Sequence, residues 1–386
     1  MTARSVLFLI TEDWFFVSHF LPMARKAREM GLDVTVVTRV RAHRAEIEAT
    51  GARVIALDAE RRSLNPFAVL RYLRTLTGIL RDERPDILHC IALRVILLGG
   101  LAARFAKIRN RVYAVTGFGF FGARRDVVGR LARLGLSAVL RGPLDGEGTR
   151  YLFENEDDPR VLGLSPTDPR VVIVGGAGVD PDAYPVTPMP AQPPLRVAVV
   201  ARMLWSKGID LAVEAVRRAR VAGADVTLSL YGSPDPSNPK AVPEQRLRAW
   251  GEIPGIHWHG PTRDPGAVWR DHHVCLLPSR GGEGLPRTLL EGAICGRALL
   301  TTDVPGCRSL VRDGTEGVVV PAEAGALAEA LQRLAADPAL VARLGNAARE
   351  RILTGYTERH VMDAVGRLYA GLLEERPAAG QAGGVP

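Results

Sequence analysis

The stretch VVIVGGAGVDPDAYPVTPMPAQPPLRVAVVAR, residues 171–202, separates two apolar runs by a segment that contains six prolines. Proline has no N–H to donate to a helix or a central strand, so regular structure should stop within this segment. The chain has 386 residues, which is more than one hydrophobic core usually organises. We therefore predict an interdomain linker at residues 181–194, between an N-terminal domain at 1–180 and a C-terminal domain at 195–356.

On both sides of this linker, short apolar runs rich in β-branched residues alternate with helical patterns. The runs are SVLFLI, DVTVVTR, RVIALD, DILHC and RVYAVT before the linker, and LRVAVVAR, DVTLSLYG, IHWHG, HVCLLPS, ALLTTDVPG and GVVVP after it. Such alternation is typical of parallel strands joined by helices. The predicted fold class is α/β, with two Rossmann-like parallel-sheet domains that face each other across a cleft. Ligands of such sheets bind at the carboxyl ends of the strands.

Composition narrows the class of protein. Hydrophobic residues make up 47% of the chain and charged residues 24%, as in soluble globular proteins, and no window approaches the ~20 apolar residues of a membrane span. The N-terminal run SVLFLI is too short for a signal peptide, so we predict a first strand and a cytoplasmic protein. The four cysteines lack metal-ligand spacing, which favours buried thiols.

The net charge of +8 lies mainly in the first half of the chain. Residues 1–180 contain 27 Lys and Arg against 20 Asp and Glu, which leaves a balance of only +1 for the remainder. A positive field suits nucleic acid, anionic lipid or a phosphorylated substrate. Acids are interspersed among the bases and stacking aromatics are absent from the basic runs, which argues against nucleic acid.

Two cations follow the first strand of the second domain, in VVARMLWSKGID. Arg202 stands near the strand end, and Lys207 precedes a helix that starts at about Gly208. A planar guanidinium, a compact ammonium and the partial positive charge of a helix N-terminus together suit a diphosphate. The alternative is an ordinary strand-end arginine and a solvated lysine.

Two carboxylates follow a later strand, in LLPSRGGEGLPRTLLEGAICG. Glu283 lies in a glycine-rich loop, and Glu291 lies about one turn inside a helix that starts near Arg287. Carboxylates accept hydrogen bonds from hydroxyl groups, so this pair suits the sugar and the ribose of a nucleotide sugar. Acids near a helix start also occur simply because they complement the helix dipole.

The motifs ARMLWSKG, EGLPRTLLE, VPGCRSLV and GGAGVD resemble those of retaining glycosyltransferases of family 4, which have the GT-B fold, over essentially the whole chain. The resemblance implies that Arg202 and Lys207 bind the donor diphosphate, that Glu283 meets the donor sugar and that Glu291 meets the ribose. It makes Arg202, Lys207 and Glu283 the catalytic candidates, and the full donor site Arg202, Lys207, Glu283, Gly284, Leu285, Pro286 and Glu291. A C-terminal helix at 357–375 is expected to cross back to the first domain, ahead of a disordered tail at 376–386.

The N-terminal half narrows the resemblance further. SLNPFAVLRYL, VTGFGFFG and SHFLPMARKAREMG are similar to the branch that includes the N-acetylgalactosaminyltransferase acting on undecaprenyl-diphosphate-linked bacillosamine. The implied reaction moves an N-acetylhexosamine or a hexose from a UDP-linked donor to a polyprenyl-diphosphate-linked sugar in bacterial surface-polysaccharide assembly, without metal or cofactor. The alternatives are a GT-B nucleotide-sugar epimerase and a non-catalytic nucleotide-sugar-binding protein. Many relatives have a Gly-Gly pair after the first strand that approaches the donor, whereas this chain has Glu12-Asp13-Trp14-Phe15 and so departs from the family pattern for a donor phosphate contact there.

The stretch VTGFGFFGARRDVVGRL contains a GxGxxG pattern at Gly117, Gly119 and Gly122. In a dehydrogenase this pattern opens the first strand–helix unit, but here it follows about the fifth strand and holds three phenylalanines, which disfavours a cofactor loop. In the resembling family this loop faces the acceptor, although core packing of the phenylalanines is the alternative. The acceptor-side candidates are Phe118, Phe120, Phe121 and Arg124, with His19 and Arg94 as additional cleft-side residues.

The helical stretch NPFAVLRYLRTLTGILRDERP has apolar residues on one face and Arg71, Arg74 and Arg81 on another. The arginine face is free to meet anionic headgroups, and each arginine near such a surface contributes about 1 kcal/mol of binding free energy. A solvated basic face is the alternative. We predict a cytoplasmic protein that is peripheral on the inner face of the plasma membrane, where it would meet its nucleotide-sugar donor and its lipid-linked acceptor.

Overall fold

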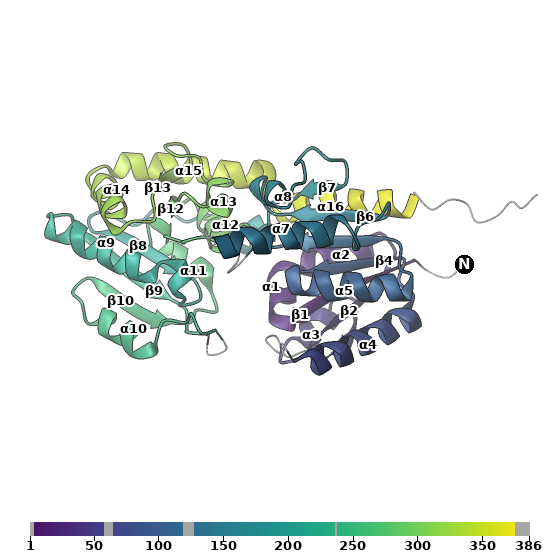
Figure 1. Cartoon of the computed structure of the whole chain (residues 1–386). Helices are drawn as coiled ribbons and strands as arrows, with labels where there is room; N and C mark the ends of the chain where they lie inside the picture. The colour runs from purple at the N-terminus through teal and green to yellow at the C-terminus, as the bar shows by residue number, and fades with distance from the viewer. Residues whose placement is uncertain (1–3, 58–64, 119–126, 236–237, 375–386) are drawn as a thin grey trace, which may run out of the picture.

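The computed structural model describes residues 4–57, 65–118, 127–235 and 238–374, which form two α/β domains next to each other (Figure 1). The expected tail at 376–386 lies outside the described residues. The fold class agrees with the prediction, because each domain is built on its own parallel sheet.

The sheet of the first domain, within the described residues, has seven parallel strands in the order β3-β2-β1-β4-β5-β6-β7. The central strands are buried on both faces, which explains their continuous apolar sequences. The expected first strand is present as β1. The bounds are β1 Ser5–Glu12, β2 Asp33–Arg39, β3 Arg53–Ala56, β4 Ile87–Ile91, β5 Arg111–Val115, β6 Thr149–Phe153 and β7 Val171–Ile173.

Helices cover both faces of this sheet and create two hydrophobic clusters. The first cluster lies under α1, α2 and α16, and the second lies under α4, α5 and α7. The bounds are α1 Asp13–His19, α2 Leu21–Glu29, α3 Arg44–Glu48, α4 Pro66–Glu83, α5 Leu93–Ala106, α7 Val127–Arg141, α8 Asp157–Val161 and α16 Glu358–Glu374.

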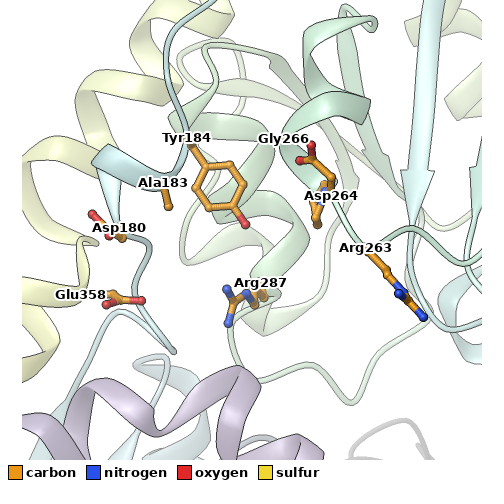
Figure 2. A pocket seen from close by; sticks show the side chains of 9 residues that line it. Asp180, Ala183, Tyr184, Arg263, Asp264, Gly266, Arg287 and Glu358 are labelled. Atoms are coloured by element: carbon orange, nitrogen blue, oxygen red, sulfur yellow. The ribbon is translucent and has the colours of Figure 1, made fainter. Parts of the chain in front are cut away.

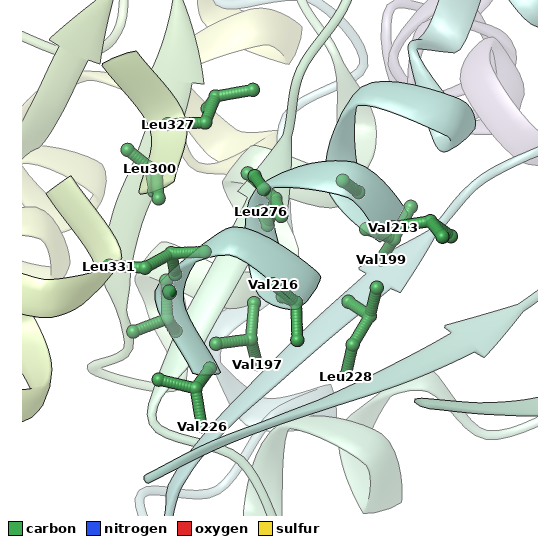
Figure 3. Packing of buried hydrophobic residues seen from close by; sticks show 14 of the residues in the cluster. Val197, Val199, Val213, Val216, Val226, Leu228, Leu276, Leu300, Leu327 and Leu331 are labelled. Carbon is green, nitrogen blue, oxygen red and sulfur yellow. The ribbon is translucent and has the colours of Figure 1, made fainter. Parts of the chain in front are cut away.

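The sheet of the second domain, again within the described residues, has six parallel strands in the order β10-β9-β8-β11-β12-β13. Valine and leucine side chains from β8, β9, β11 and β12 pack with α9 and α14 in the core shown in Figure 3. The bounds are β8 Leu195–Val200, β9 Val226–Tyr231, β10 Ile256–Gly260, β11 Val274–Leu277, β12 Ala298–Thr302 and β13 Gly317–Val320. The helices are η2 Trp205–Lys207, α9 Ile209–Val221, α10 Glu244–Gly251, α11 Pro265–Arg270, α12 Arg287–Ile294, α13 Pro305–Arg308, α14 Ala324–Ala336 and α15 Pro338–Gly355.

Three helices begin with the same N-terminal capping pattern. Asn65, Asp264 and Asp337 each precede a proline, and each side chain accepts a hydrogen bond from a backbone N–H of the first turn. Proline at the first helical position loses no hydrogen bond, and the cap satisfies an orphan donor. The starts of α4, α11 and α15 are therefore encoded locally.

The chain returns to the first domain at its C-terminal end, as expected from the resemblance. After α15, the helix α16 places Val361, Val365 and Tyr369 in the first-domain core. The Tyr369 hydroxyl lies 2.6 Å from Nδ1 of the buried His89 on β4. Between β7 and β8 the linker contains the short 3-10 helix η1, Pro181–Ala183.

Two smaller expectations concern the cysteines and membrane spans. Cys90, Cys275, Cys295 and Cys307 are all buried free thiols, as predicted. Among the helices of the described ranges, none combines the length and the apolar character that crossing a bilayer requires.

Candidate active site

The carboxyl ends of β8 and β11 bring Lys207 and Glu283 together. Lys207 ends η2 after β8, and Glu283 lies in the loop between β11 and α12. Lys207 Nζ is 2.7 Å from both carboxylate oxygens of Glu283, and Ser279 Oγ donates to Glu283 Oε1 at 2.6 Å. Both charged side chains are largely buried. A largely buried ion pair thus lies where we predicted that the diphosphate and the sugar of a donor bind.

Gly208 allows η2 to pack closely against the end of β11. Its φ is +68°, and a Cβ there would lie 1.9 Å from the carbonyl oxygen of Pro278. Glycine adopts this backbone conformation without strain, and no other residue fits against the end of β11. The close approach of η2 to β11 is what holds Lys207 opposite Glu283.

Arg202, the second predicted diphosphate-binding cation, faces the other domain. Its guanidinium carbon lies 6.0 Å from the ring centroid of Trp14 on α1, a cation–π contact. Its Nη1 also donates to Asp235 Oδ2 at 3.4 Å. Trp14 belongs to the segment that replaces the Gly-Gly pair of many relatives, so this chain has an aromatic side chain against the cation there.

His19, on the last turn of α1, lies close enough to the second domain to sense its cations. Burial, together with the charges of Arg287, Lys207 and Arg202, lowers its pKa from 6.5 to about 3. Its Nδ1 is 2.6 Å from Ser18 Oγ. The imidazole is therefore neutral at pH 7 and can offer a hydrogen bond without adding charge to the site.

Glu291 already has hydrogen-bond partners in this structure. Its Oε1 accepts from the hydroxyl of Tyr184 in the linker at 3.0 Å and from Arg287 Nε at 2.8 Å. Arg287 also donates to the backbone carbonyl of Ser18 in the first domain. The carboxylate expected at the ribose is thus tied both to the linker and, through Arg287, to α1.

A pocket of about 240 Å³ opens beside these partners, where the linker, α11, α12 and α16 meet. Figure 2 shows Tyr184 and Arg287 directed toward each other at one side of it. The pocket borders the partners of Glu291 and does not include Lys207 or Glu283. Its lining is Asp180, Ala183, Tyr184, Arg263, Asp264, Pro265, Gly266, Arg287 and Glu358.

The loop after Glu283 is held by the first domain. Leu285 N donates to Glu154 Oε2 at 2.7 Å, and Asn155 Nδ2 donates to the carbonyl oxygen of Gly284 at 3.2 Å. Gly117, the first glycine of the GxGxxG pattern, has φ +94°, and a Cβ there would lie 2.6 Å from Gly284 N. The loop expected to bind the donor is therefore fixed by direct contacts across the interdomain seam.

Two family models match the chain, one for each domain. A glycosyl transferase 4-like model covers residues 5–138, and a model of glycosyl transferases group 1 covers residues 194–337. The chain belongs to the glycosyltransferases of the GT-B fold.

Individual relatives agree with this family. The glycosyltransferase is 24% identical over 370 residues to the N,N'-diacetylbacillosaminyl-diphospho-undecaprenol alpha-1,3-N-acetylgalactosaminyltransferase of Campylobacter jejuni, over 92% of this chain and 95% of that one. A solved glycosyltransferase from Rickettsia africae superposes with a TM-score of 0.76 at 16% identity, over 97% of this chain and all of that one. An Anabaena protein solved with UDP-glucose has a TM-score of 0.76 at 15% identity, over 95% and 99% of the two chains. Such identities show the shared fold.

The acceptor-side predictions for the glycosyltransferase have mixed outcomes. Phe118 requires a correction: it is 4% exposed and packs in the first-domain core, so the core alternative describes it. The hydrophobic gain of burying a phenyl ring outweighs any local preference for the cleft. Arg94 is the half-buried second residue of α5, directly after β4. Phe120, Phe121 and Arg124 lie outside the described residues.

Sequence reasoning overlooked Glu154 and Asn155. They stand in FENEDD, which reads as an exposed acidic turn, yet both side chains are buried. Asn155 Oδ1 accepts from the backbone N–H groups of Asp157 and Asp158, so it caps the start of α8. An asparagine placed two residues after a buried strand was the available signal. Its second contact, the hydrogen bond to the carbonyl oxygen of Gly284, depends on a residue 129 positions away in the sequence.

The buried carboxyl of Glu154 predicts a pH-dependent stability. Burial is the main cause that raises its pKa from 4.5 to about 8, a value that includes the opposing effect of the Leu285 N–H and the added effect of nearby Asp158 and Glu283. The folded protein keeps this proton up to about pH 8, whereas the unfolded chain loses it near 4.5. Its contribution to stability is therefore complete below about pH 4.5 and is lost as the pH rises to 8.

We expect Glu154→Gln to gain stability relative to wild type as the pH rises from 5 to 8, by up to about 1 kcal/mol per pH unit. Urea unfolding at pH 5, 6, 7 and 8 measures this difference. Glu156→Gln, which removes an exposed carboxyl two residues away, is the matched control and should follow wild type. Parallel pH profiles for wild type and Glu154→Gln would contradict the assignment.

Proposed function

We propose that this glycosyltransferase moves an N-acetylhexosamine or a hexose from a UDP-linked donor to a sugar on polyprenyl diphosphate, in the assembly of a bacterial surface polysaccharide. The observation that carries the proposal is the Lys207–Glu283 pair at the interdomain seam, with Arg202 and neutral His19 around it. The Campylobacter jejuni relative, whose name states a lipid-linked acceptor, supports the acceptor class. A putative colanic acid biosynthesis glycosyltransferase of Salmonella typhimurium, 29% identical over 218 residues, supports the polysaccharide context.

The proposed reaction retains the anomeric configuration. The acceptor hydroxyl attacks the anomeric carbon from the face that the diphosphate leaves, so a carbon–oxygen bond forms as another breaks. The hydroxyl proton passes to the leaving phosphate. Negative charge develops on the diphosphate, where Arg202 and Lys207 stabilise it more strongly than they stabilise the bound donor.

The ion pair gives Glu283 and Lys207 a shared role. Without a donor, each neutralises the other in a site with little water. In the proposed complex the diphosphate takes the ammonium of Lys207, and the released carboxylate of Glu283 accepts hydrogen bonds from the sugar hydroxyls. Glu291 accepts from the ribose, in place of its contact with Tyr184.

A lipid-linked acceptor requires the enzyme to work at the inner, anionic face of the membrane. Arg71, Arg74 and Arg81 are exposed on α4, which makes them available to anionic headgroups. Their sheet-side neighbours Leu76 and Leu80 are buried, as the sequence pattern predicted. We propose peripheral attachment in which this arginine face contributes electrostatic attraction.

Activity should be independent of divalent cations. Among the described residues, no group of three or more His, Cys, Asp and Glu side chains is placed to hold a metal ion. The diphosphate charge is assigned instead to Arg202 and Lys207. We expect full turnover in excess EDTA, measured as sugar transfer; abolition by EDTA with recovery on adding Mg²⁺ or Mn²⁺ would count against this chemistry.

The function is tested in two steps. A thermal-shift screen of nucleotide sugars identifies the donor, since a ligand at 100 times its Kd adds about 2.7 kcal/mol to the folded state. The radiolabelled donor is then incubated with polyprenyl-linked sugars from a bacterial lipid extract. Label in the lipid fraction is expected. A new free sugar formed without acceptor would indicate the epimerase, and binding without turnover would indicate a non-catalytic protein.

A further inference from the structure

The helix α7 faces solvent with its apolar side. Only Gly129 and Leu140 of its fifteen residues are buried, and Leu136 packs partly against the first-domain core. Tyr151 donates to the carbonyl oxygen of Leu140 at 2.9 Å, which fixes the inner side of the helix. Of the twelve large exposed hydrophobic side chains among the described residues, five lie on this helix: Val127, Val128, Leu131, Leu134 and Val139.

These side chains form one continuous stripe. At 100° per residue they fall within an arc of about 140°, together with Gly135 and Ala138, on the side opposite Leu140. Leu131 and Leu134 are each 61% exposed. A surface helix normally turns its apolar stripe toward the core and its polar side toward water, and α7 does the reverse. An exposed apolar stripe of this size indicates a partner.

Charge favours a lipid surface as that partner. The helix carries Arg130, Arg133 and Arg141 and no acidic residue. Arg130 and Arg141 are exposed and flank the stripe on the same side. A second copy packed on the same face would bring these arginines together without an acid to neutralise them, whereas an anionic headgroup layer neutralises each of them.

The neighbouring helices present similar side chains. Helices α4, α5 and α7 cover the same face of the first sheet and follow one another across it (Figure 1). Phe67 on α4 is 83% exposed, and Phe105 on α5 is 53% exposed. Arg71 and Arg74 follow Phe67 by four and seven residues, which places them on the same face of α4, and both are exposed as well.

We propose that α7 lies in the headgroup region of an anionic bilayer and inserts the stripe of Val127, Val128, Leu131, Leu134 and Val139 toward the acyl chains. The helix is about 22 Å long and lies in the membrane plane, as other interfacial helices with valine, leucine and arginine do. This inference rests on the proposed function only for the idea that the acceptor is lipid-linked. It assigns membrane insertion to α7, with the arginines of α4 in a supporting electrostatic role.

The first test is sedimentation of the whole protein with vesicles of phosphatidylcholine and phosphatidylglycerol in equal amounts. Leu131→Ser/Leu134→Ser should lower the partition coefficient about 10-fold or more, because both exposed side chains lose their apolar burial. Val221→Ser, which changes an exposed valine at the end of α9 in the second domain, is the matched control and should bind as wild type does. Equal binding by the double variant and wild type would overturn the proposal.

The second test reports insertion directly. The four native cysteines are buried, so a Leu134→Cys variant can be labelled with an environment-sensitive fluorophore at one exposed site. Its emission should shift to shorter wavelength with the anionic vesicles and not with phosphatidylcholine alone, while labelled Val221→Cys should not shift. Wild type that ignores vesicles but dimerises, with the double variant monomeric, would assign the stripe to a second copy and overturn the proposal.

Transfer to an acceptor dispersed in detergent separates this inference from the proposed function. Leu131→Ser/Leu134→Ser should keep wild-type transfer in detergent, because α7 contributes none of the donor-site side chains. Normal transfer in detergent together with unchanged vesicle binding would overturn the inference and leave the function standing. Vesicle binding through α7 without any transfer by wild type would overturn the proposed function and leave the inference standing.

Discussion

Replacing Lys207 or Arg202 by alanine is expected to lower kcat/KM for sugar transfer by about 100-fold or more. In the proposed reaction both cations stabilise the leaving diphosphate, and in this structure the Lys207 ammonium holds two hydrogen bonds of 2.7 Å to Glu283. Loss of one of these positive charges removes stabilisation that grows as the leaving group becomes negative. Initial rates at several donor concentrations measure the effect.

Lys240→Ala is the matched control, because Lys240 is an exposed lysine on the same domain. It should retain wild-type kinetics. Lys207→Ala leaves a buried carboxylate unpaired, which by itself destabilises a fold. The double variant Lys207→Met/Glu283→Gln removes that penalty, so recovery of thermal stability without recovery of turnover is expected. Wild-type turnover in Lys207→Ala would contradict the assignment.

Glu283 and Glu291 are expected to differ in what they bind. Glu291→Ala should weaken the binding of free UDP about 10-fold, since a hydrogen bond to a charged group contributes roughly 1.5 kcal/mol or more. Glu283→Ala should leave UDP affinity equal to wild type or higher, because it frees the Lys207 ammonium for the diphosphate. The same variant should lose turnover by about 100-fold. Calorimetry with UDP and rates with the full donor separate the two effects.

Tyr184→Phe is the control for the Glu291 variant. It removes the linker hydroxyl that donates to Glu291 at 3.0 Å and leaves the carboxylate in place. If Glu291 binds the ribose directly, in place of Tyr184, then Tyr184→Phe should bind UDP as tightly as wild type or more tightly. Equal loss of UDP affinity in the Glu283 and Glu291 variants would refute the division of roles.

Much of the fold could be predicted because it is encoded by local pattern. Alternating apolar and helical runs indicated parallel sheets, and the proline segment at 181–194 indicated the boundary between them. The proximity of Lys207 and Glu283 could be predicted for a similar reason. Lys207 and Glu283 each follow a strand that was recognisable in sequence, and the carboxyl ends of parallel strands meet at one edge of the sheet.

Contacts between the domains could not be predicted from the residues on either side. Glu154 reads as a surface acid, but 131 positions separate it from Leu285, whose N–H it accepts. The lowered pKa of His19 has partly the same origin, because burial is its largest cause and the charges of Arg287, Lys207 and Arg202 in the other domain add to it. Such long-range partners leave no periodic or short-range signal in the sequence.

The sequence of α7 determines that it is an amphipathic helix, since Val127, Leu131, Leu134 and Ala138 recur at helical spacing. It does not determine which way that stripe faces. The tertiary structure decides this, because the inner side of α7 packs against the core through Leu136 and Leu140 and the stripe therefore faces solvent. Periodicity defines the relative angles of side chains around one helix, whereas the direction of each face is set by which neighbouring elements leave room for it.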